Sequence, residues 1–262
     1  MSQLQYQQSL EMEKFDSLKS SQGNKDDVME ETQQDVYRKA VGVLQWLAHN
    51  SKPHLGYYAC YFACQTGKAT NEDGRSLYRV LCKAKLDPTT IKFSNLGKSK
   101  DWKIITFTDS SFTHSTKKIS IHGEITLLKG NDSVNLLDWA ARKQDIPSLS
   151  SMSAEADAAL HGHGKIKMVK FLLNEVLGLE NIPSFLVVDN KSLKDAVHST
   201  HTVQDKRTFV AVATLRKMED LEGTKVLWTE AKNQLADVLT KSGANPHPLI
   251  DTMQSGKLML TI

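Results

Sequence analysis

Apolar residues follow a helical spacing over the first part of the chain. They recur at three- and four-residue intervals in one stretch: Val36, Ala40, Val43, Leu44 and Leu47. This periodicity predicts helical structure over residues 35–65, interrupted at Pro53. A second apolar helix is predicted over residues 55–64. A third is predicted over residues 76–86, where Asp87-Pro88 stops it.

The pattern changes near residue 101 to one that is typical of strands. Short β-rich runs predict strands over residues 102–108, 119–128 and 135–141. The stretch Lys129-Gly130-Asn131-Asp132 predicts the turn between the last two strands.

Helices and strands alternate after these three strands. A long helix is predicted over residues 154–177, with Ser153 as its N-cap and Gly178 near its end. The remaining elements are a strand at 184–188, helices at 191–198 and 203–221, a strand at 224–229 and a helix at 233–241. Together they predict an α/β fold with a mixed five-stranded sheet flanked by helices.

Composition and pattern divide the chain into four segments. Residues 1–34 are polar and expected to be partly disordered, with Ser17 to Gln34 as a flexible linker. Residues 35–100 form the mainly helical region and residues 101–245 the sheet domain. Residues 246–262 are expected to be a C-terminal tail.

The composition is that of a globular protein outside the membrane. With 262 residues and 40% hydrophobic residues, the chain can form one large domain or two smaller ones. No run approaches the roughly 18 apolar residues needed to span a membrane, and the polar N-terminus lacks the features of a signal peptide. Cys60, Cys64 and Cys82 form no Cys-x-x-Cys pair, and we expect them to pack as small hydrophobes rather than bind metal. A reducing intracellular setting, cytoplasmic or nuclear, fits this use of cysteine.

Charge is unevenly distributed along the chain. Residues 1–34 hold 3 basic and 7 acidic side chains, whereas residues 35–108 hold 12 basic and 5 acidic ones. Such a basic segment is typical of proteins that bind a phosphate backbone, and Arg79, Lys83 and Lys85 are the candidate contacts. The alternative interpretation is a solvated, lysine-rich surface.

Four acidic residues stand in distinctive local settings. Asp109 ends the run Ile-Ile-Thr-Phe-Thr-Asp, and Asp189 ends Phe-Leu-Val-Val-Asp, so both follow predicted strands. Glu155 and Asp237 are expected in the first turns of helices, where a carboxylate can simply complement the helix dipole. If the two strands are adjacent and parallel, Asp109 and Asp189 lie side by side. A bound cation then allows both to stay ionised, and Mg²⁺ suits such an oxygen site.

The chain resembles a known family at these acids. The stretches Thr-Asp-Ser, Arg-Lys-Gln-Asp-Ile-Pro-Ser-Leu-Ser-Ser with Ala-Glu-Ala-Asp-Ala-Ala, Val-Asp-Asn-Lys-Ser and Gln-Leu-Ala-Asp-Val-Leu-Thr-Lys are similar to the ribonuclease H domain of the pol polyprotein of copia-type long-terminal-repeat retrotransposons. Residues 37–55 resemble the thumb and connection region at the end of the preceding reverse transcriptase. The resemblance covers most of the chain after residue 35.

The resemblance implies a ribonuclease H-like fold and cleavage of the RNA strand of RNA–DNA hybrids. Asp109, Glu155, Asp189 and Asp237 would hold two Mg²⁺ ions, for which Mn²⁺ can substitute. Candidate contacts to the hybrid, where RNA is distinguished by its 2′-hydroxyls, are Ser110, Ser111, Asn190 and Ser192. Further partners would be the rest of a pol polyprotein or a reverse transcriptase palm, in a retroelement particle.

The chain also departs from the family. Ser110, Ser111 and Phe112 replace the usual acidic and aromatic pair after the first Asp, and Asp205-Lys206-Arg207 contains no His. His198 and His201 lie just upstream. No Tyr-x-Asp-Asp polymerase motif occurs, so a catalytically inactive nucleic-acid-binding remnant is the alternative hypothesis. An integrase-like nuclease is a third reading, but it would need a His/Cys zinc module that the sequence lacks.

Overall fold

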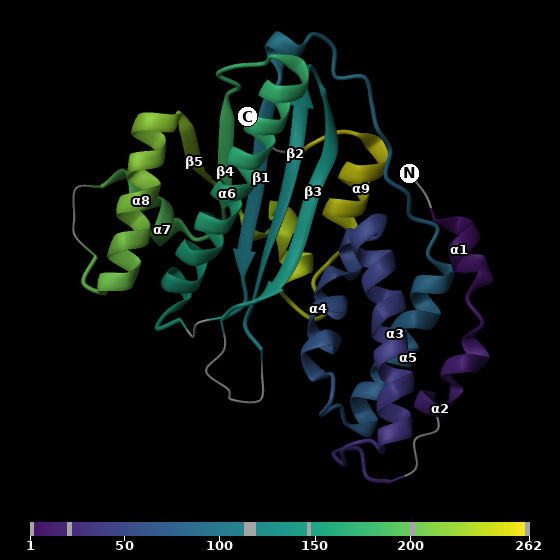
Figure 1. Ribbon diagram of the computed structural model, residues 1–262. Helices are drawn as coiled ribbons and strands as arrows, with labels where there is room; N and C mark the ends of the chain where they lie inside the picture. Colours follow the sequence, from purple (N-terminus) through teal and green to yellow (C-terminus); the bar gives the residue numbers. More distant parts are fainter. Residues whose placement is uncertain (1–2, 20–22, 113–118, 146–147, 200–202, 260–262) are drawn as a thin grey trace. The chain divides into compact units, whose positions relative to one another are not determined.

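The computed structural model describes residues 3–19, 23–112, 119–145, 148–199 and 203–259 (Figure 1). The chain forms two compact units, residues 1–90 and residues 91–262. The boundary lies earlier than the position near residue 101 at which the sequence pattern changes. Segment 91–100 therefore belongs to the unit that contains the sheet.

The first unit is helical in its described residues. Its elements are α1 (Leu4–Ser9), η1 (Met12–Phe15), α2 (Asp16–Lys19), α3 (Glu31–Asn50), η2 (Pro53–Leu55), α4 (Gly56–Gln65) and α5 (Asn71–Leu86). Tyr37, Leu44 and Leu77 are fully buried in its core. The α5 helix begins earlier than expected, because Thr70 and Asp73 form a capping box within the polar stretch before residue 76.

The N-terminal segment is part of this core and not only a loose polar tail. Leu10, Phe15, Leu18 and Met29 are buried against the helices. The Gln7 amide donates to the Ala84 carbonyl at 2.7 Å. The prediction of a flexible linker over residues 17–34 is wrong for its described residues, because a few widely spaced apolar side chains suffice to dock the segment.

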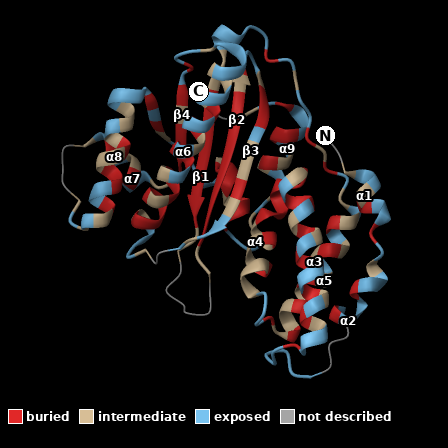
Figure 2. Cartoon of the chain, viewed as in Figure 1, coloured by how far each residue is buried: buried red, intermediate tan, exposed pale blue. Residues whose placement is uncertain are grey.

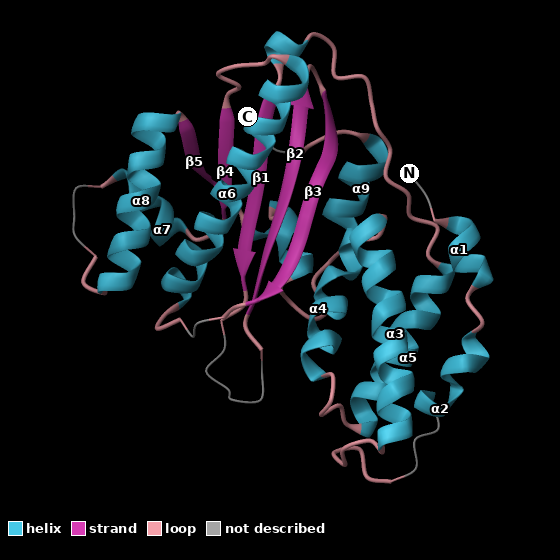
Figure 3. Cartoon of the chain, in the orientation of Figure 1, coloured by secondary structure: helices cyan, strands magenta, loops and turns pink. Residues whose placement is uncertain are grey.

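The second unit is built on a five-stranded sheet. Its strands are β1 (Lys103–Ser110), β2 (Ile121–Gly130), β3 (Ser133–Lys143), β4 (Ser184–Val188) and β5 (Thr224–Trp228), in the spatial order β3-β2-β1-β4-β5. The β1–β2 and β2–β3 pairs are antiparallel, whereas β4 is parallel to both β1 and β5. The predicted fold class, a mixed five-stranded sheet flanked by helices and preceded by a mainly helical region, is confirmed (Figure 3).

Helical segments cover both faces of this sheet. The helices α6 (Ser151–Leu177), α7 (Lys191–His198) and α8 (Lys206–Glu222) share one core with Ile104 and Leu186. The 3₁₀ segment η5 (Leu235–Leu239) and the helix α9 (His247–Ser255) share the other with Phe107 and Val187. The central strands are therefore almost wholly buried (Figure 2). Two further 3₁₀ turns are η3 (Ser99–Asp101) and η4 (Ala231–Asn233).

The structure corrects three expectations about individual elements. The α6 helix starts at Ser151, with Ser150 and not Ser153 as its N-cap, so Glu155 lies beyond the first turn. The last predicted helix is 3₁₀ and not α-helical around Asp237. The expected tail contains α9, where Leu249 and Met253 are buried. Among the described residues, no helix is both long and apolar enough to cross a bilayer.

Candidate metal centre

Two of the predicted acids meet because their strands are adjacent and parallel. The register pairs Phe107 with Val187, which places Asp109 near the end of β1 beside Asp189, the residue that follows β4. The expectation that two parallel strand ends bring these carboxylates together is confirmed.

Glu155 joins them from α6, which approaches the sheet very closely. A Cβ atom on Gly162 of this helix would lie 2.2 Å from Cγ2 of Thr108 in β1. Only glycine fits there, so the helix can pack on the strand at short range. Buried alanines at positions 154, 156, 158 and 159 flank Glu155 on the same helix. Small residues thus hold a carboxylate-bearing turn against the end of β1.

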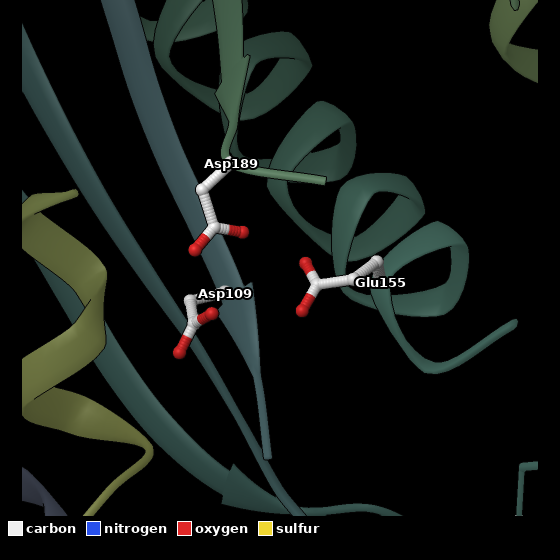
Figure 4. Close-up of side chains that lie close together, drawn as sticks. All are labelled: Asp109, Glu155 and Asp189. Atoms are coloured by element: carbon white, nitrogen blue, oxygen red, sulfur yellow. The ribbon is translucent and has the colours of Figure 1, made fainter. Parts of the chain in front are cut away.

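The three carboxylates converge on one point (Figure 4). Ligand oxygens of Asp109, Glu155 and Asp189 all lie within 4.8 Å of one another. The Ser110 backbone N–H and hydroxyl both donate to Glu155 Oε1, at 3.1 and 2.9 Å. The other oxygen, Oε2, is buried and has no hydrogen-bond partner in the described part of the protein. A buried carboxylate oxygen without a hydrogen-bond partner is well suited to bind a metal ion.

Burial makes these acids costly to ionise on their own. Desolvation and the neighbouring Asp109 and Asp189 charges raise the pKa of Glu155 to about 9. Desolvation also raises the pKa of Asp109 to about 6 and raises that of Asp189. A cation is the natural means to keep all three groups charged.

The fourth acid, Asp237, lies beside this cluster on η5. Gln234 fixes η5 to the sheet, because its Nε2 group donates to the Thr108 carbonyl at 2.9 Å and its Oε1 accepts from Ala236 N–H. The segment packs closely on β2, since a Cβ atom on Gly123 would lie 2.6 Å from Cβ of Leu239. The sequence Gln-Leu-Ala-Asp therefore serves as an anchor that carries Asp237 to the end of β1.

Two residues after η5 complete the site. The Thr240 hydroxyl donates to Asp109 Oδ2. The Lys241 ammonium lies 3.3 Å from Asp109 Oδ1 and forms an ion pair with Asp237 Oδ1. Asp237 is therefore linked to the three-acid cluster through Lys241 and Asp109.

The residues of the site fit a divalent metal ion. Three converging carboxylates, one with an orphaned buried oxygen, form the hard oxygen donor set that Mg²⁺ and Mn²⁺ prefer. Asp109, Glu155 and Asp189 would hold the first ion. Asp237 would contribute to a second only beside Asp109.

The segment after Asp189 is held on both sides. The Trp228 indole N–H donates to the Asp189 carbonyl at 2.9 Å, although the Trp228 residue is 42% exposed. Asn190 Oδ1 accepts from Leu193 N–H and caps α7. These contacts fix the backbone turn that carries the Asp189 carboxylate.

The other predicted contact residues have varied surroundings. Ser111 Oγ bonds with the backbone of Ile121, and Ser192 is exposed on α7. Arg79 pairs with Glu72 at 2.7 Å, Lys85 donates to the Leu10 carbonyl, and Lys83 is exposed, all on α5 of the first unit. Their contact with a substrate stays a prediction.

Of the two histidines named from the sequence, the structure places only His198, and its polar contacts are with residues other than the four acids. His198 bonds with the Lys194 carbonyl and lies 3.3 Å from Glu219, while His201 lies outside the described residues.

Sequence reasoning missed four residues of the site, namely Gln234, Thr240, Lys241 and Trp228. Lys241 had a detectable signal, because it follows Asp237 by four residues in the same motif. Gln234 and Thr240 stand in that motif too. Trp228 had no such signal, since only the parallel pairing of β4 and β5 brings it to Asp189.

No protein-family model matches the chain, and no curated protein matches it. Among solved structures, ribonuclease H1 from the halophilic archaeon Halobacterium salinarum NRC-1 is similar at 13% identity and a TM-score of 0.39, covering 57% of this chain and 98% of that one. LC11-RNase H1 in complex with an RNA/DNA hybrid is similar at 16% identity and a TM-score of 0.38, covering 52% of this chain and 93% of the other.

A foamy viral protease–reverse transcriptase in complex with an RNA/DNA hybrid is similar at 12% identity and a TM-score of 0.36. The match covers 66% of this chain and 26% of that one. With TM-scores below 0.5, all three likenesses are too weak to assign an activity, which depends on the chain's own residues.

Proposed function

We propose that this chain is a ribonuclease H, a metal-dependent endonuclease for the RNA strand of RNA–DNA hybrids. The observation that carries the proposal is the convergence of Asp109, Glu155 and Asp189 from two parallel strand ends and one helix. Asp237, held beside Asp109, is the fourth acid that the sequence pointed to.

The proposed reaction is hydrolysis of a phosphodiester. Water attacks the phosphorus atom and loses a proton, the bond to the 3′-oxygen breaks, and that oxygen takes up a proton. When bound, a pair of Mg²⁺ ions stabilises both the attacking and the leaving oxygen. We propose Mg²⁺ as the ion, with Mn²⁺ as a substitute.

The chain's own residues orient the acids for this reaction. Ser110 holds Glu155 through two hydrogen bonds, and Thr240 holds Asp109. Trp228 restrains the backbone at Asp189. A rigid donor set needs little reorganisation when charge develops on the phosphate, which is how preorganised sites lower a barrier.

We propose that the hybrid is recognised beside the acids by Ser111, Asn190 and Ser192. Asn190 uses only its Oδ1 atom in the cap of α7, and its Nδ2 group carries two N–H donors suited to a 2′-hydroxyl. Of the basic candidates on α5, we propose that the exposed Lys83 adds one phosphate contact, because Arg79 pairs with Glu72 and Lys85 donates to the Leu10 carbonyl.

We propose that the chain originates in a copia-type pol polyprotein, and the motif Gln-Leu-Ala-Asp-Val-Leu-Thr-Lys supports this origin. With it we propose an intracellular location and a polymerase palm as partner. The residues of the motif anchor η5 and supply Asp237, Thr240 and Lys241 to the site, so the whole motif has a structural use.

Cleavage of a labelled RNA–DNA hybrid tests the proposal. Wild-type protein with Mg²⁺ or Mn²⁺ should cut the RNA strand, whereas Asp189→Asn should lose at least a hundredfold of the rate while keeping its circular dichroism spectrum. Asp195→Asn is a matched control, because Asp195 is exposed on α7. If folded wild-type protein binds the hybrid and cuts neither strand with either ion, the chain is instead a non-catalytic nucleic-acid-binding remnant.

A further inference from the structure

A positive charge already lies among the acids. The Lys241 ammonium reaches Asp109 Oδ1, at 3.3 Å, and Asp237 Oδ1. Its side chain is 43% exposed, whereas that of Asp109 is 1% exposed. A lysine based at the surface therefore extends its charged end onto a buried carboxylate.

This arrangement differs from an ordinary surface ion pair. Lys241 follows Asp237 by four residues, a spacing at which lysine and aspartate often pair with little effect on stability. An ordinary ion pair of this kind involves only these two side chains and no second acid from another element. Here the same ammonium also contacts Asp109 on β1, which has its other oxygen bonded to Thr240. Both oxygens of Asp109 are thus engaged by residues 240 and 241.

The Lys241 side chain keeps its positive charge in this setting. Burial lowers the pKa of Lys241, but the attraction of Asp109, Asp237 and Asp189 and the hydrogen bond to Asp237 outweigh it and hold the pKa above its ordinary value. An ammonium is a compact point charge, so it can take the place of a metal ion between two carboxylates.

A divalent ion between Asp109 and Asp237 would need the oxygens that Lys241 occupies. At Glu155 and Asp189 there is no such conflict, because in the described part of the chain Lys241 forms ion pairs with Asp109 and Asp237 and not with these two acids. The two parts of the site should therefore differ in how readily they accept an ion.

We propose that Lys241 is a resident cation that competes with a divalent ion for Asp109 and Asp237. One ion binds at Asp109, Glu155 and Asp189 with Lys241 in place, and a second binds only when Lys241 leaves. The inference rests on the proposed function in one respect, namely that the acid cluster is a metal site.

Titration of the full chain with Mn²⁺, followed by calorimetry or by the electron paramagnetic resonance of free Mn²⁺, tests the competition. Wild-type protein should bind one ion tightly and a second at least tenfold more weakly. Lys241→Met should bind the second ion at least tenfold more tightly than wild type does. Lys241→Arg keeps the charge and should retain the wild-type order.

Lys232→Met is the matched control. Lys232 is an exposed lysine nearby in sequence that pairs with Glu230 and, among the described residues, forms no ion pair with the four acids. This variant should bind Mn²⁺ as wild type does. Equal second-ion affinity in wild type and Lys241→Met, or weaker affinity in the variant, would overturn the inference.

A second measurement needs no substitution, in case Lys241→Met does not fold. Acetylation of wild-type lysines, read by mass spectrometry, should be slow at Lys241 without metal. It should speed up severalfold as the second Mn²⁺ binds, with Lys232 unchanged. Constant reactivity of Lys241 across the titration would contradict its release.

These experiments contain no nucleic acid, so their failure is distinct from failure of the nuclease proposal. Ordered Mn²⁺ binding with no cleavage of a hybrid would reject the nuclease and keep the role of Lys241. Cleavage together with identical binding in wild type and Lys241→Met would reject Lys241 and keep the nuclease. Absence of Mn²⁺ binding in every variant would overturn both.

Discussion

At the scale of single residues, Glu155 shows how function and stability conflict in this protein. It is a buried carboxyl with one oxygen held by Ser110 and the other without a partner in the described part of the chain. An unpaired buried group destabilises the fold by about 1–3 kcal/mol. A fold that needs no ion would place a neutral side chain there.

We predict that Glu155→Gln stabilises the metal-free protein at alkaline pH. Desolvation holds the pKa of Glu155 at about 9 in the folded chain, above its ordinary value of 4.5. The folded state thus binds more protons than the unfolded state between these values, and its stability falls as pH rises through them. Gln keeps the acceptor for Ser110 and carries no charge, so this loss disappears.

Urea unfolding in EDTA at pH 5.5 and pH 8.5 measures the effect of this substitution. Glu155→Gln should be more stable than wild type by about 1–3 kcal/mol at pH 8.5, with a much smaller difference at pH 5.5. Added Mn²⁺ should reverse the order, because binding to the folded state stabilises wild type more. The same pH dependence in both proteins would show that Glu155 does not titrate in this range.

Trp228 gives a second prediction at this scale. Trp228→Phe keeps an aromatic ring but removes the indole N–H that donates to the Asp189 carbonyl. We expect Mn²⁺ affinity to fall by about three- to tenfold and stability to fall by about 0.5–1.5 kcal/mol. Trp46→Phe, at an exposed position of α3 in the first unit, is the control. Unchanged Mn²⁺ affinity in Trp228→Phe would show that this hydrogen bond does not position Asp189.

At the scale of elements, the close approach of α6 to β1 places Glu155 in the site. Gly162 permits that approach, and Gly164, on the same helix, has no neighbouring atom within 4 Å of a Cβ position. Alanine substitutions at these two glycines therefore distinguish the effect of helix propensity on stability from the effect of packing.

We predict opposite effects for the two alanine substitutions. Gly162→Ala forces α6 away from Thr108 and should destabilise the protein by about 1–3 kcal/mol and weaken Mn²⁺ binding. Gly164→Ala should stabilise it by up to about 1 kcal/mol and leave Mn²⁺ binding unchanged. Thermal unfolding and Mn²⁺ titration measure both. Equal behaviour of the two variants would mean that the close packing does not position Glu155.

The elements also show which features the sequence could reveal. Apolar runs that end in Asp109 and Asp189 predicted the strands, and parallel pairing of β1 with β4 brought the acids together. The secondary structure around Asp237 is harder to predict, because the apolar residues of Gln-Leu-Ala-Asp-Val-Leu have the spacing of a helix. Its 3₁₀ form depends on a tertiary hydrogen bond from Gln234 to Thr108. No local pattern contains that bond.

The polar N-terminal segment was mispredicted for a related reason. Its low content of apolar residues indicates disorder, yet Leu18 and Met29 are buried against the helices of the first unit. Burial of a few side chains at wide spacing leaves no periodic signal.

At the scale of the whole molecule, the docked N-terminal segment changes the interpretation of charge. The basic stretch 35–108 suggested a region that binds phosphates. The structural unit 1–90 joins part of that stretch to the acidic start of the chain and holds 11 basic and 11 acidic side chains. Residues 91–262 hold 22 basic and 19 acidic ones. The first unit is therefore neutral overall, and Arg79 is already paired with Glu72.

We predict that residues 91–262 fold alone, bind Mn²⁺ and cut the hybrid. All four acids and the two cores that surround the sheet lie in this part of the chain. Because the first unit is neutral, its deletion should change the slope of log affinity for the hybrid against log salt by less than one, which is roughly the contribution of a single phosphate contact.

Binding of a labelled hybrid at several salt concentrations, in EDTA, compares the full chain with the fragment. A drop in slope of two or more would mean that the first unit places several cations on phosphates despite its neutral balance. In that case Lys83→Ala is the next variant, because Lys83 is exposed whereas Arg79 and Lys85 have partners within their own unit. A fragment that folds yet binds no Mn²⁺ would instead show that the metal centre needs residues before Ile91.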